Sequence, residues 1–141
     1  MEALVRSQFE GIAKSSTAAP ERRYPVPLPA ELQVKVASDP EATQSSVSLV
    51  RKRAADTETR VADYRASLVR QLAYQMMNDR FDEMSRKPDA PFLNAGAFGS
   101  GLSPSVATFA LSASVQDGKI DAGLAALAIE AKRVKEHVEV D

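Results

Sequence analysis

A long amphipathic segment between residues 57 and 85 constrains the fold of this chain more than any other feature. Its apolar residues recur at spacings of three, four, four and four, at Val61, Tyr64, Leu68, Leu72 and Met76. This is the periodicity of a helix with one apolar face. Such a helix is roughly 40 Å long, which is enough to cross a whole sheet. We therefore expect it to be the spine of the core, with Leu68 and Leu72 buried and Arg70 on the opposite side.

The ends of this helix carry stop and start signals. Asp56 or Thr57 can cap its N-terminus. Phe81 and Met84 continue the apolar pattern after a drift in its spacing. Lys87-Pro88 then closes the helix, because proline disfavours helical geometry in the residue before it.

Four further segments have the pattern of strands. Apolar and polar residues alternate over residues 32–36 and 46–52, which predicts an antiparallel ribbon with a loop longer than a tight hairpin. Residues 107–115 alternate more clearly, and residues 91–97 are expected to form another strand. The Asp117-Gly118 pair predicts a turn after the strand at 107–115.

Two more helices are expected near the chain ends, over residues 2–12 and 121–138. Val5, Phe9 and Ile12 share one face of the first. The second has an unbroken apolar stripe, at Ile120, Leu124, Leu127, Ala131, Val134 and Val138. Strand pairs that alternate with helices predict a single α+β domain over residues 1–141, with a two-layer arrangement of a mostly antiparallel sheet and helices packed on one face.

The charge and composition exclude several classes of partner. Eighteen basic and 19 acidic residues give a net charge of -1, so nothing draws the chain to nucleic acid or to an anionic membrane. The longest apolar run, residues 122–128, is far too short to span a bilayer. The chain has no cysteine, which excludes disulfides and thiolate chemistry. We therefore expect neither a nucleic-acid nor a membrane partner.

A metal site has few candidate ligands. His137 is the single histidine, with Glu136 and Glu139 beside it and Glu130 seven residues earlier. Catalytic zinc sites draw three protein ligands. This group is therefore interpreted as the solvated end of a helix, and we assign no metal ligand, no cofactor-binding residue and no catalytic residue in this chain.

A glycine-rich stretch from Gly96 to Gly101 resembles a nucleotide loop only superficially. Its spacing is G-x-x-G-x-G, the reverse of the dinucleotide fingerprint G-x-G-x-x-G. Ser100 lies between two glycines but does not match the hydrolase pattern G-x-S-x-G. The stretch is interpreted as a mobile loop or as a bulged, glycine-kinked strand.

Charged residues and methionines on the long helix have two interpretations each. Its arginines alternate with acids, which is typical of a solvated face with ion pairs, and the basic triplet at residues 51–53 is interpreted in the same way. Met76 and Met77 could line a peptide-binding groove, but their helical spacing favours core packing.

Several short motifs, in order and at characteristic intervals, carry a family resemblance. They are DPEAT at 39–43, VSLVRK at 47–52, DYR at 63–65, MNDRFDE at 77–83 and PDAPFL at 88–93. FEGI at 9–12, GLAAL at 123–127 and EAKRV at 130–134 extend the similarity to nearly the whole chain. Together these motifs resemble the second, non-catalytic domain of the insulinase/pitrilysin (inverzincin) zinc metallopeptidases, particularly of their bacterial subfamily.

The resemblance implies a role without chemistry. In that family the first domain of the amino-terminal half carries H-x-x-E-H, a motif that this chain lacks. The second domain helps to enclose a chamber that holds a peptide substrate. The resemblance thus implies a metallohydrolase-like fold, a fragment of a longer multidomain peptidase, and zinc in the catalytic domain of the parent protein. It also implies a periplasmic or cell-envelope location, and partners that are the neighbouring domains and the peptide substrate.

An alternative function belongs to another class. The chain could be a free-standing interaction module that binds a partner through a sheet edge or through the stretch at 96–105. An H-x-x-E-H motif upstream in one reading frame would favour the peptidase fragment. A domain cut from a larger protein exposes its former interfaces, so we also expect a weak homodimer in solution.

Overall fold

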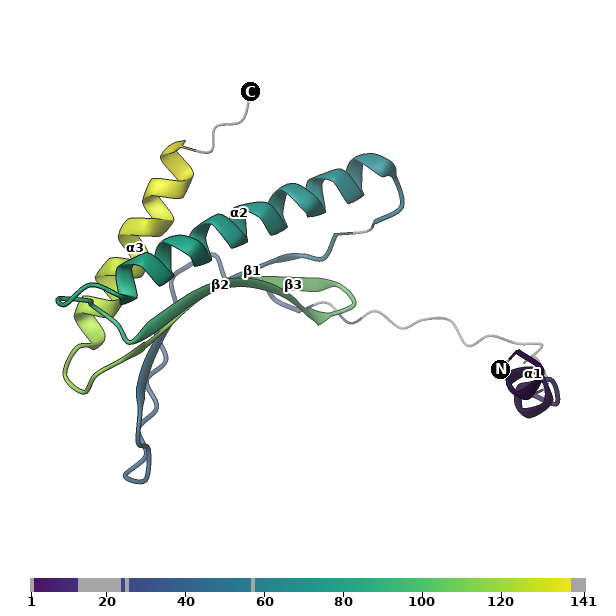
Figure 1. Ribbon diagram of the computed structural model, residues 1–141, viewed down its shortest axis with the longest axis horizontal. Helices are drawn as coiled ribbons and strands as arrows, with labels where there is room; N and C mark the ends of the chain where they lie inside the picture. Colours follow the sequence, from purple (N-terminus) through teal and green to yellow (C-terminus); the bar gives the residue numbers. More distant parts are fainter. Residues whose placement is uncertain (1, 13–23, 25, 57, 138–141) are drawn as a thin grey trace.

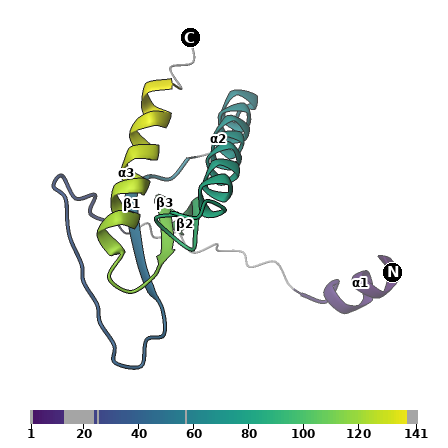
Figure 2. The same ribbon diagram turned by 60° about the vertical axis from the view of Figure 1, so that its left-hand side comes forward.

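The computed structural model describes residues 2–12, 24, 26–56 and 58–137 of the 141-residue chain. In chain order its elements are α1 (Glu2–Phe9), β1 (Ser45–Ala54), α2 (Val61–Ser85), β2 (Asn94–Ser103), β3 (Val106–Val115) and α3 (Ile120–His137). The three strands form an antiparallel sheet in the order β1-β3-β2. Helices α2 and α3 lie on the same face of this sheet (Figures 1 and 2). The predicted α+β fold, with helices on one face of an antiparallel sheet, is confirmed.

The core lies between the sheet and the two helices. Its four largest fully buried side chains are Phe81 from α2, Leu127 from α3, and Leu111 and Val115 from β3. Alternate residues of β3 point toward the helices because strand side chains alternate between faces. The ring of Phe92, in the loop before β2, meets Phe81 edge to face with centroids 5.9 Å apart. The predicted strand at 107–115 and the predicted C-terminal helix therefore supply most of the core.

A glycine lets α3 approach the sheet closely. A Cβ atom on Gly123 would lie 2.5 Å from Cγ1 of Val115 and 3.4 Å from Cγ1 of Val47. Real Cβ atoms essentially never come within 3.0 Å of another heavy atom. The turn that leads into α3 also depends on glycine, since Gly118 has a φ of 78°. This turn is the one that the Asp117-Gly118 pair predicts.

The glycine-rich stretch is a strand rather than a mobile loop. It runs inside β2 and pairs with β3, with a register shift between Gly101 and Ser103. The interpretation as a bulged, glycine-kinked strand is therefore correct. The strand begins at Asn94 instead of at residue 91, and it continues past residue 97. Gly99 makes room for Tyr74, since a Cβ there would lie 3.0 Å from the ring of Tyr74.

The side chain of Asn78 fastens α2 to the edge of the sheet. Its amide nitrogen donates to the carbonyl oxygen of Ala97 (3.1 Å), and its amide oxygen accepts from the N–H of Ala97 (2.7 Å). Ala97 lies on β2, which is an edge strand. Asn78 therefore satisfies both backbone groups that Ala97 turns away from β3, as a neighbouring strand would.

The predicted strand at 32–36 is wrong. These residues are described and form no strand, and Leu32, Val34 and Val36 are all exposed. Strand β1 pairs instead with β3, from Ser45 opposite Val115 to Ala54 opposite Val106. The alternating pattern indicates which residues could share one face of a strand, but a strand in a sheet also needs a neighbouring strand with which its backbone forms hydrogen bonds. Among the described residues, nothing pairs with the outer edge of β1.

The helix boundaries differ from the predicted ones at several ends. Helix α2 begins at Val61, four residues later than predicted, and its N-cap is Arg60. The carboxylate of Asp63 accepts the backbone N–H groups of Arg60 (3.0 Å) and Thr59 (3.2 Å), and so replaces the predicted cap. Asp56 does not cap the helix, and Thr57 lies outside the described residues. Helix α1 ends at Phe9, and α3 spans Ile120–His137; Val138, the predicted last residue of that helix, lies outside the described residues.

Candidate interaction surface

The apolar face of α2 points away from the core. We call this face the α2 stripe, and its residues are Val61, Tyr64, Leu68, Val69, Leu72 and Met76. All six are exposed; Val61 is 87% exposed, Met76 71% and Leu72 61%. The prediction that Leu68 and Leu72 form the spine of the core is therefore wrong.

The buried face of α2 lies on the opposite side of the helix. Its buried residues are Ser67, Met77 and Phe81. Nine residues separate Leu72 from Phe81, and at about 100° per residue this separation places them half a turn apart. The drift in spacing between Met76 and Phe81 marks the change from one face to the other. The two adjacent methionines divide in the same way, since Met76 is exposed and Met77 is buried.

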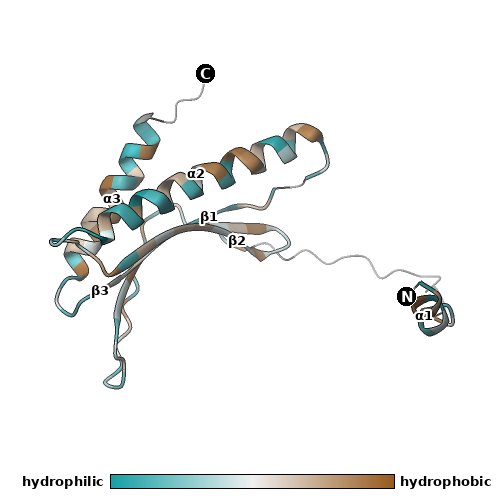
Figure 3. Ribbon diagram, in the orientation of Figure 1, coloured by the Kyte–Doolittle hydropathy of each residue, from teal (hydrophilic) through white to brown (hydrophobic). Residues whose placement is uncertain are grey.

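Small residues of the sheet lie under the middle of α2, where Gly99 approaches the ring of Tyr74. The sheet below it is β2, whose sequence from Asn94 to Ser103 is rich in glycine, alanine and serine. The ring of Tyr74 covers this surface and stacks on Phe109, with centroids 5.3 Å apart. Toward its N-terminus the helix rises away from the sheet, and apolar residues recur along this part of it (Figures 1 and 3). The α2 stripe is thus presented on the side of the helix that faces away from the sheet.

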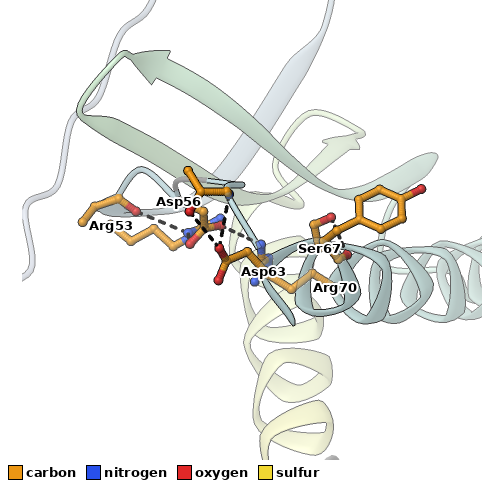
Figure 4. A network of polar contacts seen from close by, with 8 residues as sticks. Arg53, Asp56, Asp63, Ser67 and Arg70 are labelled. Carbon is orange, nitrogen blue, oxygen red and sulfur yellow. Dashed lines mark hydrogen bonds and ion pairs between the residues drawn. The ribbon is translucent and has the colours of Figure 1, made fainter. Parts of the chain in front are cut away.

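An ion-pair cluster holds this raised half of α2 in place. The carboxylate of Asp56 binds Nη1 of Arg53 at the end of β1 (2.7 Å) and Nη2 of Arg70 on α2 (2.6 Å). Figure 4 shows the two guanidinium groups converging on this carboxylate. The hydrogen bond from Arg53, with help from Arg70, holds the pKa of Asp56 below its ordinary value. Arg70 is therefore a link between α2 and β1 rather than a solvated side chain opposite the core.

A second ion pair joins the two helices. Glu130 on α3 is buried, and its carboxylate binds Nε of Arg80 on α2 (3.3 Å) and Nη1 of Arg133 (3.8 Å). The predicted ion-paired surface is also present in part, since Arg80 lies 3.8 Å from Glu83. The buried carboxylate of Glu130 thus forms ion pairs with two arginines.

The residues weighed as metal ligands do not form a site within the described part of the chain. His137 is the last residue of α3, and nothing is described of its side chain. Glu136 pairs with Lys132 (3.7 Å), and Glu139 lies outside the described residues. Over residues 2–12, 24, 26–56 and 58–137, no group of three or more histidine, cysteine, aspartate or glutamate side chains could hold a metal ion.

The remaining concave and hydroxyl-rich places have no catalytic arrangement. A shallow hollow at the C-terminal end of α2 is lined by Ser85, Lys87, Pro88, Ala90, Pro91, Phe92, Leu93, Gln116 and Lys119. This lining includes neither a carboxylate nor an imidazole that could act as a base. The hydroxyl of Ser100 pairs with that of Thr108 (2.9 Å), across from β2 to β3. Ser100 is therefore part of a sheet surface, and its hydroxyl partner within the described part of the chain is Thr108 rather than a base.

Comparison with models of protein families, with curated proteins and with solved structures finds no match. Among the described residues, no helix is long and apolar enough to cross a membrane.

The α2 stripe is visible in the sequence, but its orientation is not. Periodicity finds it correctly as one continuous face, and the change in spacing before Phe81 is the signal that the core lies elsewhere. Asn78 and the cluster around Asp56 leave no such signal, because each joins residues from separate elements.

Proposed function

We propose that this chain is a non-catalytic domain that docks on another folded polypeptide through the α2 stripe. The observation that carries the proposal is the exposure of this stripe on a helix whose opposite face is already packed. Its six residues extend from Val61 to Met76, which is about 22 Å along the helix axis. A contiguous apolar face of this kind is typical of a protein–protein contact.

The chemistry of the stripe indicates the kind of partner it fits. Its aliphatic and methionine side chains favour an apolar surface of another protein, such as the face of a helix. Arg65, an exposed residue that lies within the stripe between Val61 and Leu68 on the helical lattice, favours a carboxylate inside the surface of that partner. The surface thus fits a folded neighbour better than a nucleic acid or a lipid headgroup.

The family resemblance names the parent protein in this proposal. The motifs at 39–43, 77–83 and 88–93 support a zinc-dependent metallopeptidase of the insulinase type. In such a protein this domain would help to wall the peptide chamber, and the catalytic zinc would be bound by the H-x-x-E-H motif of another domain. A free-standing interaction module would use the same stripe, and it would differ in having no such motif in its reading frame.

Paired substitutions on α2 test the docking surface. Leu72→Glu with Met76→Glu places two charges on the stripe, while Ala125→Glu with Ala128→Glu adds the same charge at exposed positions of α3. In the isolated chain the stripe is expected to cause weak self-association, which light scattering over a concentration series measures. The first pair should abolish the association, and the second should leave it intact. A strictly monomeric native chain, or equal effects of the two pairs, would contradict the proposed surface.

A separate assay tests the non-catalytic role. The chain should not cleave a fluorogenic peptide when zinc is added, because its single imidazole cannot supply the three protein ligands that a catalytic zinc needs. Turnover that is lost in His137→Ala would overturn this part of the proposal. Activity that appears only when the chain is joined to the histidine-bearing domain of its parent protein would support it.

A further inference from the structure

The N-terminal helix α1 has an apolar face that is not packed against the rest of the molecule. Leu4, Val5, Phe9 and Ile12 are all exposed, and α1 has no buried residue. Figures 1 and 2 show α1 standing apart from the sheet and from α2 and α3. The chain therefore contains two exposed apolar helix faces, one on α1 and one on α2.

We propose that α1 docks on the α2 stripe of its own chain and acts as an intramolecular cover for the docking surface. This inference rests on the proposed function, because it assigns a regulator to the same surface. The docked helix would bury Val5 and Phe9 against the stripe, with the ion pair between Glu2 and Arg6 (3.0 Å) at the edge of this contact. An external partner would then have to displace α1 in order to bind.

The connection between the two helices is anchored near the first half of α2. The hydroxyl of Ser105, in the turn between β2 and β3, donates to the carbonyl oxygen of Tyr24 (3.3 Å). The carbonyl oxygen of the same Ser105 accepts the N–H of Ala55 (3.0 Å). The next residue, Asp56, binds Arg70 on α2. Tyr24 is thus joined through a few contacts to the half of α2 that carries the stripe.

The chain between α1 and this anchor is long enough to reach the whole stripe. Twelve residue-to-residue steps separate Ile12 from Tyr24, and a chain spans at most about 3.6 Å per step, or roughly 43 Å in all. Helix α2, with 25 residues, is roughly 37 Å long. An intramolecular contact also has the advantage of effective concentration, which a separate molecule lacks.

The other exposed apolar segment fits the stripe less well. Leu32, Val34 and Val36 alternate along the chain, so they could share a face only on extended backbone. A helix packs its ridges of side chains into the grooves of another helix, and α1 has this geometry. We therefore assign the cover to α1 and not to residues 32–36.

Paramagnetic relaxation measures the docking directly. The chain has no cysteine, so Ser7→Cys gives a single attachment point for a nitroxide, on the side of α1 away from its apolar face. At a concentration where the chain is monomeric, the nitroxide should broaden the methyl signals of Leu68, Leu72 and Met76. The added substitution Phe9→Glu should remove this broadening. Unbroadened stripe signals, or broadening found only between a nitroxide-bearing chain and a second, isotope-labelled chain, would overturn the proposal.

Self-association gives an independent readout that separates this inference from the proposed function. If α1 covers each stripe four-fifths of the time and the weak dimer joins two stripes, Phe9→Glu should lower the dissociation constant of the dimer by about 25-fold, because both stripes must be uncovered. The control Ser7→Glu, on the opposite side of α1, should leave the constant unchanged. A higher constant in Phe9→Glu would show that α1 joins two chains, and would overturn the cover. If α1 does not cover the stripe, the stripe itself is still tested separately, by the effect of Leu72→Glu with Met76→Glu on self-association.

Discussion

The two halves of α2 differ in what they contact. The second half packs Met77 and Phe81 into the core and fastens to β2 through Asn78. The first half turns Leu72 outward and is held through polar contacts, chiefly the ion pair between Arg70 and Asp56. One continuous helix is therefore a core element at one end and the support of an exposed apolar surface at the other.

This difference shows how an exposed surface can be kept rigid without burying its apolar residues. The core anchors one end of the helix through the hydrophobic effect. The other end is positioned by two arginines that share one carboxylate, which leaves the aliphatic side chains free for a contact with another polypeptide. The three predictions below test this division, in order of decreasing effect.

The largest effect is expected from truncating the core end. Phe81→Ala should lower the free energy of unfolding by about 3–5 kcal/mol, because the Phe81 side chain is fully buried and its loss leaves a cavity. Leu72→Ala, at an exposed position of the same helix, should change it by about 0.5 kcal/mol or less. Urea unfolding of the two variants measures both values. Similar losses in both variants would mean that the stripe is part of the core.

An intermediate effect is expected at the edge of the sheet. Asn78→Ala leaves the N–H and the carbonyl group of Ala97 without their side-chain partner, and should cost about 1–3 kcal/mol. Gln75→Ala, at an exposed position three residues earlier, is the control. Hydrogen exchange should speed up at the amide of Ala97 in the first variant only. An amide that stays equally protected would show that Asn78 does not close this edge.

The smallest effect on stability is expected at the first half of α2, where Arg70 binds Asp56, and this effect depends on pH. The pKa of Asp56 is lowered in the folded chain from its ordinary value of 3.8, first by the hydrogen bond from Arg53. The Asp56 carboxylate therefore binds a proton more readily in the unfolded chain than in the folded chain. The stability that its ion pairs contribute is fully present above the ordinary pKa, and it is lost as the pH falls through the lowered pKa of the folded chain. When the free energy of unfolding is measured by urea as a function of pH, Asp56→Asn should reduce its fall at acid pH. Near neutral pH the dependence on pH should be the same in both proteins. An acid side that stays as steep in this variant would assign the effect to other carboxylates.

Much of the fold could be predicted from the sequence, because local patterns decide it. Strand β3 alternates cleanly and α3 has an unbroken apolar stripe, and both lie close to their predicted positions. The class of fold follows from the order of these elements. The sequence is compatible with two interpretations of the glycine-rich strand β2, because its backbone order comes from pairing with β3, which is a contact that composition does not encode.

The partners of the elements could not be predicted in the same way. Residues 32–36 alternate like a strand, and yet β1 pairs with β3, more than 50 positions further along the chain. The α2 stripe has the strongest periodicity in the chain and nevertheless faces outward. Hydrophobic periodicity identifies a helix face that favours burial. It does not say whether that face is buried in the domain's own core or against another molecule.

The close approach at Gly123 limits how α3 can move. A shift of α3 by one residue in register, which is a rise of about 1.5 Å with a rotation of about 100°, would bring the side chain of Ala122 or Leu124 to the place where only a hydrogen atom fits between Val115 and Val47. Such a change of register is therefore blocked by steric contact with the two valines. The missing side chain at Gly123 thus selects which turn of α3 lies against the sheet, and the ion pair from Glu130 to Arg80 of α2 forms only in that one register.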